Sequence, residues 1–398
     1  MSTSNVPAPS AKPSLPHWNT PLGEPRPPVE KSIINFGILG AGWWATTAHL
    51  PALQANPRAR VIGLQSRSRD GLEKIASDYD VQHTFTSVED LIALPGLDAV
   101  IDASTPNMHF HNARTCLRHG LHLLMEKPMS LTVAQASELV SLAEEKNLHL
   151  LISCPWHYTD HAIAAQRLVA DGHLGDLKMI SILFTNFSGG LYRAKTWKEL
   201  FAEGGDPAYV TPHVTPEANS YSDPAIAGGG QIFCQVSHAA AYIGFLTGSD
   251  PAEVFAHFNN AEIDIDVYDT LCLKLRNGCL VTLASTGDPM PSRRQFELRA
   301  FGTEGMLLME LWEGTMEFHP RKGKVQIFPR LDEAAVYPLH APANNLVDLV
   351  AGEAPNQSPG ELGLYAMKII ESACISARTG RNVLLNPKPT TQSAAAAE

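Results

Sequence analysis

The fold is decided by residues 33–45, which read IINFGILGAGWWA. The first part of this stretch, residues 33–39, is short, apolar and rich in β-forming side chains, so it predicts a buried strand. Gly40-Ala41-Gly42 ends the strand, and residues 45–55 fit a helix that stops near Pro57. A strand, a glycine turn and a helix in this order are typical of the first unit of a dinucleotide-binding fold.

Each small residue of the turn has a physical reason. Gly40 permits a tight turn, Gly42 lets the backbone approach a pyrophosphate, and Ala45 permits close packing of the helix on the strand. The N-terminus of the helix then faces the phosphates. Trp43 and Trp44 lie within the turn, and we include them among the predicted cofactor-binding residues.

The alternation of strands and helices continues to residue 153. Further strands are predicted at residues 60–65, 99–103, 121–125 and 149–153, and helices at about residues 71–78, 88–94, 109–119 and 132–147. This rhythm predicts an α/β Rossmann domain with a parallel sheet.

After residue 178 the pattern changes. Strands are predicted at residues 179–187, 253–260, 270–276, 279–286, 294–301, 306–311 and 315–319, without long helices between them, followed by a final helix at 361–379. Asn277-Gly278 is a hairpin signal. We therefore expect an α+β C-terminal domain with a large, mostly antiparallel sheet, and loops over a site at the Gly- and Pro-rich residues 191–230.

The predicted domain organisation has four parts. They are a Pro-rich N-terminal arm (1–30), an NAD(P)-binding Rossmann domain (31–155), a substrate-binding and oligomerisation domain (156–386) and a flexible tail (387–398). Prolines break any helix or central strand in the arm. It is either a disordered leader or an arm that lies on a neighbouring subunit, anchored by Trp18 and Leu22.

Composition excludes several classes of protein. Of the 398 residues, 44% are hydrophobic, which is enough for a sizeable core, and no apolar stretch is long enough to span a membrane. The net charge of −11, without a basic block, argues against nucleic acid as a partner. The six cysteines are scattered without metal-ligand spacing, so we expect no metal. No apolar leader is evident at the N-terminus, so we expect a cytoplasmic location.

The residues after the second strand bear on the choice of cofactor. An acid at this place would bind the ribose 2′-hydroxyl of NAD. Gln65 is followed instead by Ser66, Arg67, Ser68 and Arg69, which can hold a 2′-phosphate. The sequence slightly favours NADP and leaves NAD open, because an arginine here can also simply be solvated.

Glu126-Lys127-Pro128 closes the strand at 121–125, and with the glycine motif it resembles the Gfo/Idh/MocA oxidoreductase family, which includes glucose–fructose oxidoreductase and inositol dehydrogenase. The resemblance extends to the turn at 172–176 and to residues 104–109, which resemble the family loop that lines the cofactor. It implies that the following residues bind cofactor: Thr105, Pro106, Asn107, His109, Glu126 and Lys127.

The resemblance also implies the catalytic residues. The Gly228-Gly229-Gly230 segment followed by His238 resembles the family's catalytic loop and helix. Lys127 and His238 would then handle the proton of the substrate hydroxyl. Many members carry an aspartate where this chain has Cys234, so the usual set is incomplete. We expect Gln231, Cys234 and Gln235 to contact substrate, as in a branch that acts on sugars or glycosides, some members oxidising C3.

Trp156, His157 and Tyr158 follow the last parallel strand, where open α/β sheets bind ligands. Aromatic faces suit sugar C–H surfaces, so these residues are predicted to bind substrate. The alternative is an aromatic hinge between the domains. His157 and His161 have the spacing of a zinc pair but lack its glutamate, which argues against a metal.

Three functions fit this pattern. The first is an NAD(P)-dependent oxidoreductase of a sugar, cyclitol or glycoside. The second is a glycoside-cleaving enzyme that uses transient C3 oxidation and elimination, with a further base from His157, Tyr158 or His213. The third is a non-catalytic sensor of sugar or cofactor. The resemblance also implies a homodimer or homotetramer formed through the C-terminal sheet.

Overall fold

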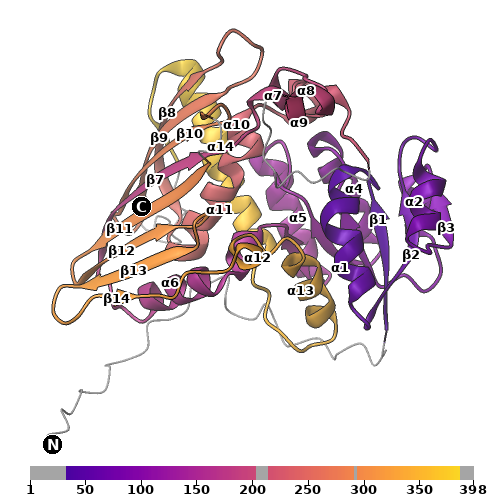
Figure 1. Ribbon diagram of the computed structural model, residues 1–398, viewed down its shortest axis with the longest axis horizontal. Coiled ribbons are helices and arrows are strands. Elements are labelled where there is room, and N and C mark those ends of the chain that lie inside the picture. Colours follow the sequence, from indigo (N-terminus) through magenta and orange to yellow (C-terminus); the bar gives the residue numbers. More distant parts are fainter. Residues whose placement is uncertain (1–32, 203–213, 291–293, 386–398) are drawn as a thin grey trace, which may run out of the picture.

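The computed structural model describes residues 33–202, 214–290 and 294–385 (Figure 1). The predicted Pro-rich arm (1–30) and flexible tail (387–398) therefore lie outside the described residues, as does His213. Figure 1 shows one sheet on the right, in indigo and purple, and a second sheet on the left, with most of its strands in orange. The predicted boundary between residues 155 and 156 stays a prediction.

The first sheet is parallel, and its strand order is β3-β2-β1-β4-β5-β6. Its strands are β1 (Ile34–Leu39), β2 (Ala59–Gln65), β3 (His83–Phe85), β4 (Ala99–Asp102), β5 (His122–Met125) and β6 (Leu150–Ile152). The connecting helices are α1 (Leu50–Ala55), α2 (Leu72–Asp78), α3 (Val88–Ile92), α4 (Pro106–Arg118) and α5 (Val133–Glu145). This is the doubly wound order of a Rossmann domain, so the predicted parallel sheet is confirmed.

The helix after the glycine turn begins differently from the prediction. Residues Ala45–His49 form a π-helical turn, η2, before α1 starts. The hydroxyl of Thr46 donates to the carbonyls of Gly42 and Trp43, and that of Thr47 donates to Trp43 as well. Threonine hydroxyls that bond to preceding carbonyls loosen a helix locally, and π-turns recur at functional sites. The turn places His49, which is fully buried, at its end.

The second sheet, within the described residues, has nine strands in the order β14-β13-β12-β11-β7-β10-β9-β8-β15. They are β7 (Leu177–Thr185), β8 (Pro251–Asn259), β9 (Tyr268–Leu275), β10 (Leu280–Thr286), β11 (Gln295–Gly302), β12 (Gly305–Glu310), β13 (Thr315–Pro320), β14 (Gln326–Ile327) and β15 (Val383–Leu384). Only the β7–β10 pair is parallel among these strands, so the predicted, mostly antiparallel sheet is confirmed. Buried and exposed residues alternate along β9, as expected for a sheet covered on one face.

The expectation that no long helix interrupts this second set of strands is wrong at one place. Helix α11 (Val236–Thr247) lies between β7 and β8. It is buried along almost its whole length, so it lacks the apolar stripe by which a surface helix is found. The Gly-rich turn before it forms α10 (Gln231–Cys234). The predicted final helix is α14 (Gly360–Thr379), and α6 (Asp160–Ala170) joins the two sheets.

Helix α13 (Ala341–Val350) belongs late in the sequence but packs against the first sheet. Its apolar residues share a core with β1 and α1, including Leu346 and Val347. The predicted loop region over the cavity contains the short helices α7 (Gly189–Tyr192), α8 (Trp197–Ala202), η4 (Ala218–Ser220) and α9 (Pro224–Ala227). Among the described segments, no helix is both long and apolar enough to cross a bilayer.

Candidate active site

A cavity of about 850 Å³ lies between the two sheets. Its size falls within the ~300–1,000 Å³ typical of ligand sites. Sixteen of the sequence-predicted site residues line it: Gly40, Gly42, Trp43, Trp44, Ser66, Arg67, Ser68, Thr105, Pro106, His109, Glu126, Lys127, Trp156, Cys234, Gln235 and His238. The structure therefore brings together most of the residues that the motifs pointed to, from both halves of the chain.

Four predicted residues do not line this cavity. Asn107 is exposed on α4, where its side-chain oxygen accepts a hydrogen bond from the Thr105 hydroxyl at 2.7 Å. The Tyr158 hydroxyl donates to Asn345 at 3.2 Å. Gln231 is fully buried, and its amide donates to Ser285 at 2.7 Å and accepts from Tyr192 at 2.7 Å. The polar groups of these three residues therefore bond to other parts of the chain, Asn107 at the surface and Gln231 in the interior.

His157, the fourth, is part of the packing between helices. Its ring stacks on Phe245 with centroids 4.6 Å apart, and Nδ1 lies 3.0 Å from the Ser358 hydroxyl. Burial lowers the pKa of His157 to about 3, so its imidazole is neutral at physiological pH. The aromatic-hinge interpretation thus fits His157 and Tyr158 (η3, Pro155–Tyr158), whereas Trp156 of the same turn faces the cavity.

The glycine turn is shaped for a ligand with a bulky, polar group. Gly40 has φ +71°, and a Cβ there would lie 2.5 Å from the backbone of Ser104, so only glycine fits. A Cβ on Gly42 would meet nothing closer than 3.9 Å, so space is open in front of that backbone. The Gln65 side chain accepts from the Gly40 N–H at 3.3 Å and thereby fixes the turn. These features fit the pyrophosphate of a dinucleotide.

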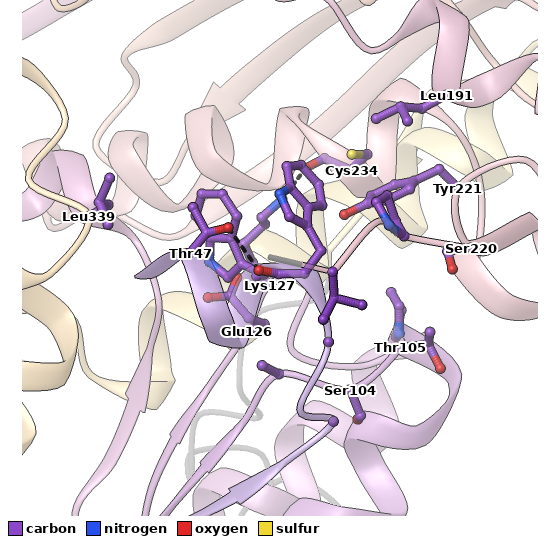
Figure 2. Close-up of a pocket in the computed structure, with 18 of the residues that line it drawn as sticks. Thr47, Ser104, Thr105, Glu126, Lys127, Leu191, Ser220, Tyr221, Cys234 and Leu339 are labelled. Atoms are coloured by element: carbon purple, nitrogen blue, oxygen red, sulfur yellow. Dashed lines mark hydrogen bonds between the residues drawn. The ribbon is translucent and has the colours of Figure 1, made fainter. Parts of the chain in front are cut away.

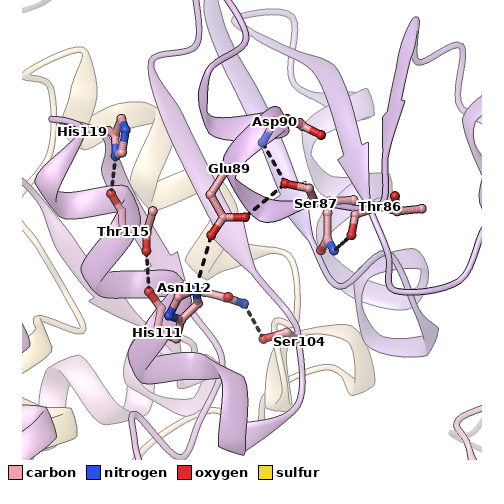
Figure 3. A network of polar contacts seen from close by, with 10 residues as sticks. Thr86, Ser87, Glu89, Asp90, Ser104, His111, Asn112, Thr115 and His119 are labelled. Carbon is pink, nitrogen blue, oxygen red and sulfur yellow. Dashed lines mark hydrogen bonds and ion pairs between the residues drawn. The ribbon is translucent and has the colours of Figure 1, made fainter.

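A polar network holds the loop on the other side of this turn (Figure 3). Figure 3 shows Asn112 on α4 donating to the Ser104 hydroxyl, at 3.0 Å, and Glu89 facing His111. His109 is buried and connects two loops, because its ring nitrogens lie 3.0 Å from the Ser104 carbonyl and 2.7 Å from the Pro128 carbonyl. The loop that lines the cavity is therefore tied to the Glu126-Lys127-Pro128 segment.

Lys127 points into the cavity and toward the second half of the chain (Figure 2). Its Nζ donates to the Cys234 carbonyl at 2.8 Å, and the Lys127–Pro128 peptide is cis. The neighbouring Glu126 is buried and lies 2.9 Å from Nε2 of His49. Burial raises the pKa of Glu126, but the hydrogen bond and charge of His49, together with the charge of Lys127 and a hydrogen bond from Ser153, lower it overall. Sequence reasoning missed His49, which no motif marks.

His238 lies on α11 beside the cavity and is 4% exposed. Its ring packs edge-on against Trp156 with centroids 5.2 Å apart, and Nδ1 has no hydrogen-bond partner among the described residues. Burial, followed by the charge of Lys127, lowers the pKa of His238 well below its usual value. The imidazole is therefore neutral and retains one nitrogen lone pair for a ligand or a proton.

The Gly228-Gly229-Gly230 loop rests on a buried aspartate that the sequence did not point to. Asp266 accepts hydrogen bonds from the backbone N–H groups of Gly230, at 2.9 Å, and Ile232, at 2.6 Å. A Cβ on Gly230 would lie 1.9 Å from the Asp266 carbonyl, so the close approach requires glycine. Asp266 thus fixes α10, whose last residue presents its carbonyl to Lys127.

An aromatic wall at the same end of the cavity was also missed. Trp156 packs against Trp312, with centroids 4.9 Å apart, and against Tyr337 at 4.6 Å. The Arg294 guanidinium lies 4.0 Å from the centroid of the Trp312 ring. These residues come from separate loops without a fixed spacing, so only the fold brings them together. No group of three or more metal-ligating side chains occurs in the part of the chain that the structure describes.

A doubly wound sheet with a glycine turn at its edge and a lysine at the adjoining cavity defines the class of Rossmann-fold oxidoreductases. Residues 34–153 match the oxidoreductase family with an NAD-binding Rossmann fold, GFO_IDH_MocA, and residues 162–308 match the GFO/IDH/MocA C-terminal domain. The chain belongs to the Gfo/Idh/MocA oxidoreductase family, and it is an NAD(P)-dependent oxidoreductase.

Individual relatives are distant. A 1,5-anhydro-D-fructose reductase from Ensifer adhaerens is 24% identical over 357 residues, 87% of this chain and 97% of that protein. An uncharacterized oxidoreductase from Synechocystis is 28% identical over 149 residues, so the match spans 37% of this chain and only 40% of that relative. The crystal structure of an aldose–aldose oxidoreductase from Caulobacter crescentus, complexed with glycerol, has a TM-score of 0.71 at 20% identity and covers 89% of this chain and 100% of its own. At that identity it shows the shared fold.

Proposed function

We propose that the protein exchanges hydride between a nicotinamide cofactor and a secondary hydroxyl, or the corresponding ketone, of a sugar, cyclitol or glycoside. The observation that carries this proposal is that Lys127 and His238 line the same cavity as the glycine turn. When bound, the nicotinamide supplies the hydride acceptor or donor. The protein must hold the substrate oxygen and move its proton.

Lys127 is suited to hold the substrate oxygen. One of its N–H groups is directed at the Cys234 carbonyl, which fixes the ammonium and leaves its other protons for a ligand. A positive charge at this place stabilises an alkoxide that develops during oxidation. In the reducing direction, the same ammonium donates a proton to the ketone oxygen. The neutral His238 supplies the second polar contact and a proton acceptor.

The aromatic wall supports a carbohydrate substrate. Trp312 and Tyr337 line the cavity and provide apolar ring area of the kind that packs on sugar C–H groups, while Trp156, which is 2% exposed, packs against both. Cys234 and Gln235 lie at the cavity, and we retain them as substrate contacts. The relative from Ensifer and the structure from Caulobacter carry names that refer to sugars, which supports the same class of substrate.

For the cofactor, the residues after β2 favour NADP. Ser66, Arg67 and Ser68 line the cavity and can bond to a 2′-phosphate. The side chain of Gln65 is not available, because it bonds to the Gly40 N–H and the Thr86 carbonyl. The preference is tested by comparing the dissociation constants of NADPH and NADH.

The glycoside-cleaving alternative needs a further base near the substrate. His157 and Tyr158 do not line the cavity, and His213 lies outside the described residues. No observation on the described residues favours this alternative or the non-catalytic sensor, so the oxidoreductase proposal stands alone. Steady change in nicotinamide absorbance with a panel of sugars, cyclitols and glycosides tests it. Cleavage of a glycoside without net change in the cofactor would contradict it.

We also propose that the protein is a homodimer or homotetramer formed through the second sheet. One face of this sheet carries exposed apolar side chains: Met179, Leu183, Tyr268 and Leu280 are 36–54% exposed. Met179 and Leu280 are neighbours in the parallel β7–β10 pair. An uncovered apolar face of this kind suits a second copy of the chain. Light scattering tests the proposal: Leu280→Arg should lower the measured mass, and a monomeric unaltered protein would contradict it.

A further inference from the structure

The corner of the cavity beside β2 contains a carboxylate, that of Glu217, from a distant segment of the chain. Nη2 of Arg67 lies 3.3 Å from Oε2 of Glu217, and both residues line the cavity. Arg67 follows β2 in the first half of the chain, whereas Glu217 comes just before η4, in the segment that covers the cavity. The ion pair therefore joins two segments that are far apart in the sequence.

Contacts of the neighbouring residues hold the backbone that carries Glu217 at this corner. The Ser220 N–H donates to the Glu217 carbonyl at 3.0 Å, which closes the turn that contains η4. The next residue, Tyr221, packs edge-on against Trp43 of the glycine turn, with centroids 6.4 Å apart. Figure 2 shows Ser220 and Tyr221 on the same side of the cavity as Thr105. The segment that carries Glu217 is thus attached to the wall where a dinucleotide would lie.

The Arg67–Glu217 pair is weak by itself. The two side chains are 60% and 66% exposed, and ion pairs in water at the surface contribute little. A phosphate monoester carries more charge and forms stronger hydrogen bonds with a guanidinium. A 2′-phosphate at this corner must displace Glu217 from Arg67 and then faces the repulsion of the freed carboxylate. A 2′-hydroxyl meets neither penalty, and a carboxylate can accept its hydrogen bond.

We propose that Glu217 is a cofactor-selectivity residue, which competes with the 2′-phosphate for Arg67 and so weakens NADP(H) relative to NAD(H). In NAD-binding Rossmann domains, an acid at the end of β2 binds the ribose 2′-hydroxyl. Glu217 would take this role from the second half of the chain. The inference rests on the proposed function only in that the cavity binds NAD(P). Glu217 would reduce the preference for NADP(H) that Ser66, Arg67 and Ser68 provide, whichever cofactor binds more tightly overall.

The test measures binding by the full-length protein without any substrate. Dissociation constants for NADPH and NADH follow from quenching of tryptophan fluorescence, since Trp43 and Trp44 line the cavity. Glu217→Gln should lower the NADPH constant about two- to fivefold, the effect of releasing an exposed ion pair, with little change for NADH. Glu333→Gln is the matched control, because Glu333 also lines the cavity but lies on α12 (Glu333–Val336), well away from β2 in Figure 1.

A double-variant cycle shows whether Arg67 mediates the effect. Arg67→Gln should weaken NADPH binding, and adding Glu217→Gln to it should recover less affinity than it gains with Arg67 present. An unchanged NADPH/NADH ratio in Glu217→Gln, or an equal shift in Glu333→Gln, would overturn the inference while leaving the proposed function intact. Failure of the unaltered protein to bind either cofactor would overturn both.

Discussion

The Nζ atom of Lys127 donates a 2.8 Å hydrogen bond to the backbone carbonyl of Cys234. The resemblance to the family implies that many members carry an aspartate where this chain has Cys234, and a cysteine side chain cannot replace a carboxylate. In the structure, the acceptor for the lysine is the main-chain carbonyl at this position. A carbonyl fixes the position of the ammonium without neutralising its charge, which leaves that charge available to the substrate oxygen.

Replacement of Lys127 tests its role directly. Lys127→Met keeps the length of the side chain but removes the ammonium, so kcat should fall about 10²- to 10⁴-fold, as for loss of a group that moves a proton. NAD(P)H affinity should stay within a few-fold, as measured by fluorescence. Lys178→Met, at an exposed lysine of β7, is the control and should behave as the unaltered protein. Full activity of Lys127→Met would refute the assignment.

Asp266 and Asp269 should respond differently to the same change. Asp269 is buried and neither of its oxygens has a donor among the described residues, so burial, followed by the charge of Asp266, raises its pKa well above the usual value. A proton on Asp269, shared with Asp266, removes the conflict. We expect Asp269→Asn to keep its activity. Asp266→Asn should lose both kcat and stability, because one N–H of the Gly230 loop is left without an acceptor.

The pH dependence of the free energy of unfolding provides a second test of the protonation of Asp269. The stability contributed by protonated Asp269 is full below its unfolded pKa, about 3.9, and is lost as pH rises through the raised folded pKa. The side-chain amide of the Asp269→Asn variant does not titrate, so the advantage of this variant in free energy of unfolding should grow between pH 5 and pH 8. Urea denaturation at the two pH values measures it. An equal difference at both would show that Asp269 is ionised throughout.

The buried neutral histidines predict sensitivity to acid. In the folded state the pKa of His157 is about 3 and that of His238 is also lowered, both chiefly by burial. In the unfolded chain the same two histidines take up protons near pH 6.5. Stability is therefore lost as pH falls below about 6.5, by up to ~1.4 kcal/mol per pH unit for each group. His157→Gln should flatten this slope in denaturation measured between pH 5 and 7. An unchanged slope would mean that His157 is charged in the folded protein.

The aromatic wall gives a prediction about substrate binding. Trp312→Ala removes a ring that packs on Trp156 and Tyr337, so KM for the sugar should rise about tenfold, whereas the affinity for NADH should not change. Steady-state kinetics with the best substrate of the panel, together with cofactor titration, separates the two effects. Equal weakening of substrate and cofactor would indicate general loss of structure.

The fold was predictable wherever local pattern and tertiary structure agree. The strands of both sheets other than the short β3, β14 and β15 have periodic or continuous apolar residues bounded by turn residues, and they were predicted to within a few residues. Strands β14 and β15 were not predicted, because two residues are too short to show a period. Helix α11 was not found by periodicity, because burial on all sides erases the amphipathic stripe. The π-helical turn after the glycines contains hydroxyl–carbonyl hydrogen bonds from Thr46 and Thr47, and a helical pattern of apolar residues does not reveal it.

The site was predictable where a motif fixes the residues in sequence. The glycine turn and the Glu126-Lys127-Pro128 segment do so, and both line the cavity. His49, Asp266 and Glu217 act through contacts made across 77, 34–36 and 150 residues of chain, so no spacing could mark them. Conversely, His157 and Gln231 have the residue types of a sugar site but are used in the packing of the second half of the chain.

One experiment with cofactor and substrate together tests whether the protein is an oxidoreductase that depends on Lys127. Purified protein is mixed with NAD or NADP and a panel of sugars, cyclitols and glycosides, and the absorbance of the reduced nicotinamide is followed for the unaltered chain and for Lys127→Met. We expect steady turnover with at least one secondary alcohol, which Lys127→Met loses while it still binds the cofactor. Tight cofactor binding without turnover on any substrate, in either direction, would contradict it.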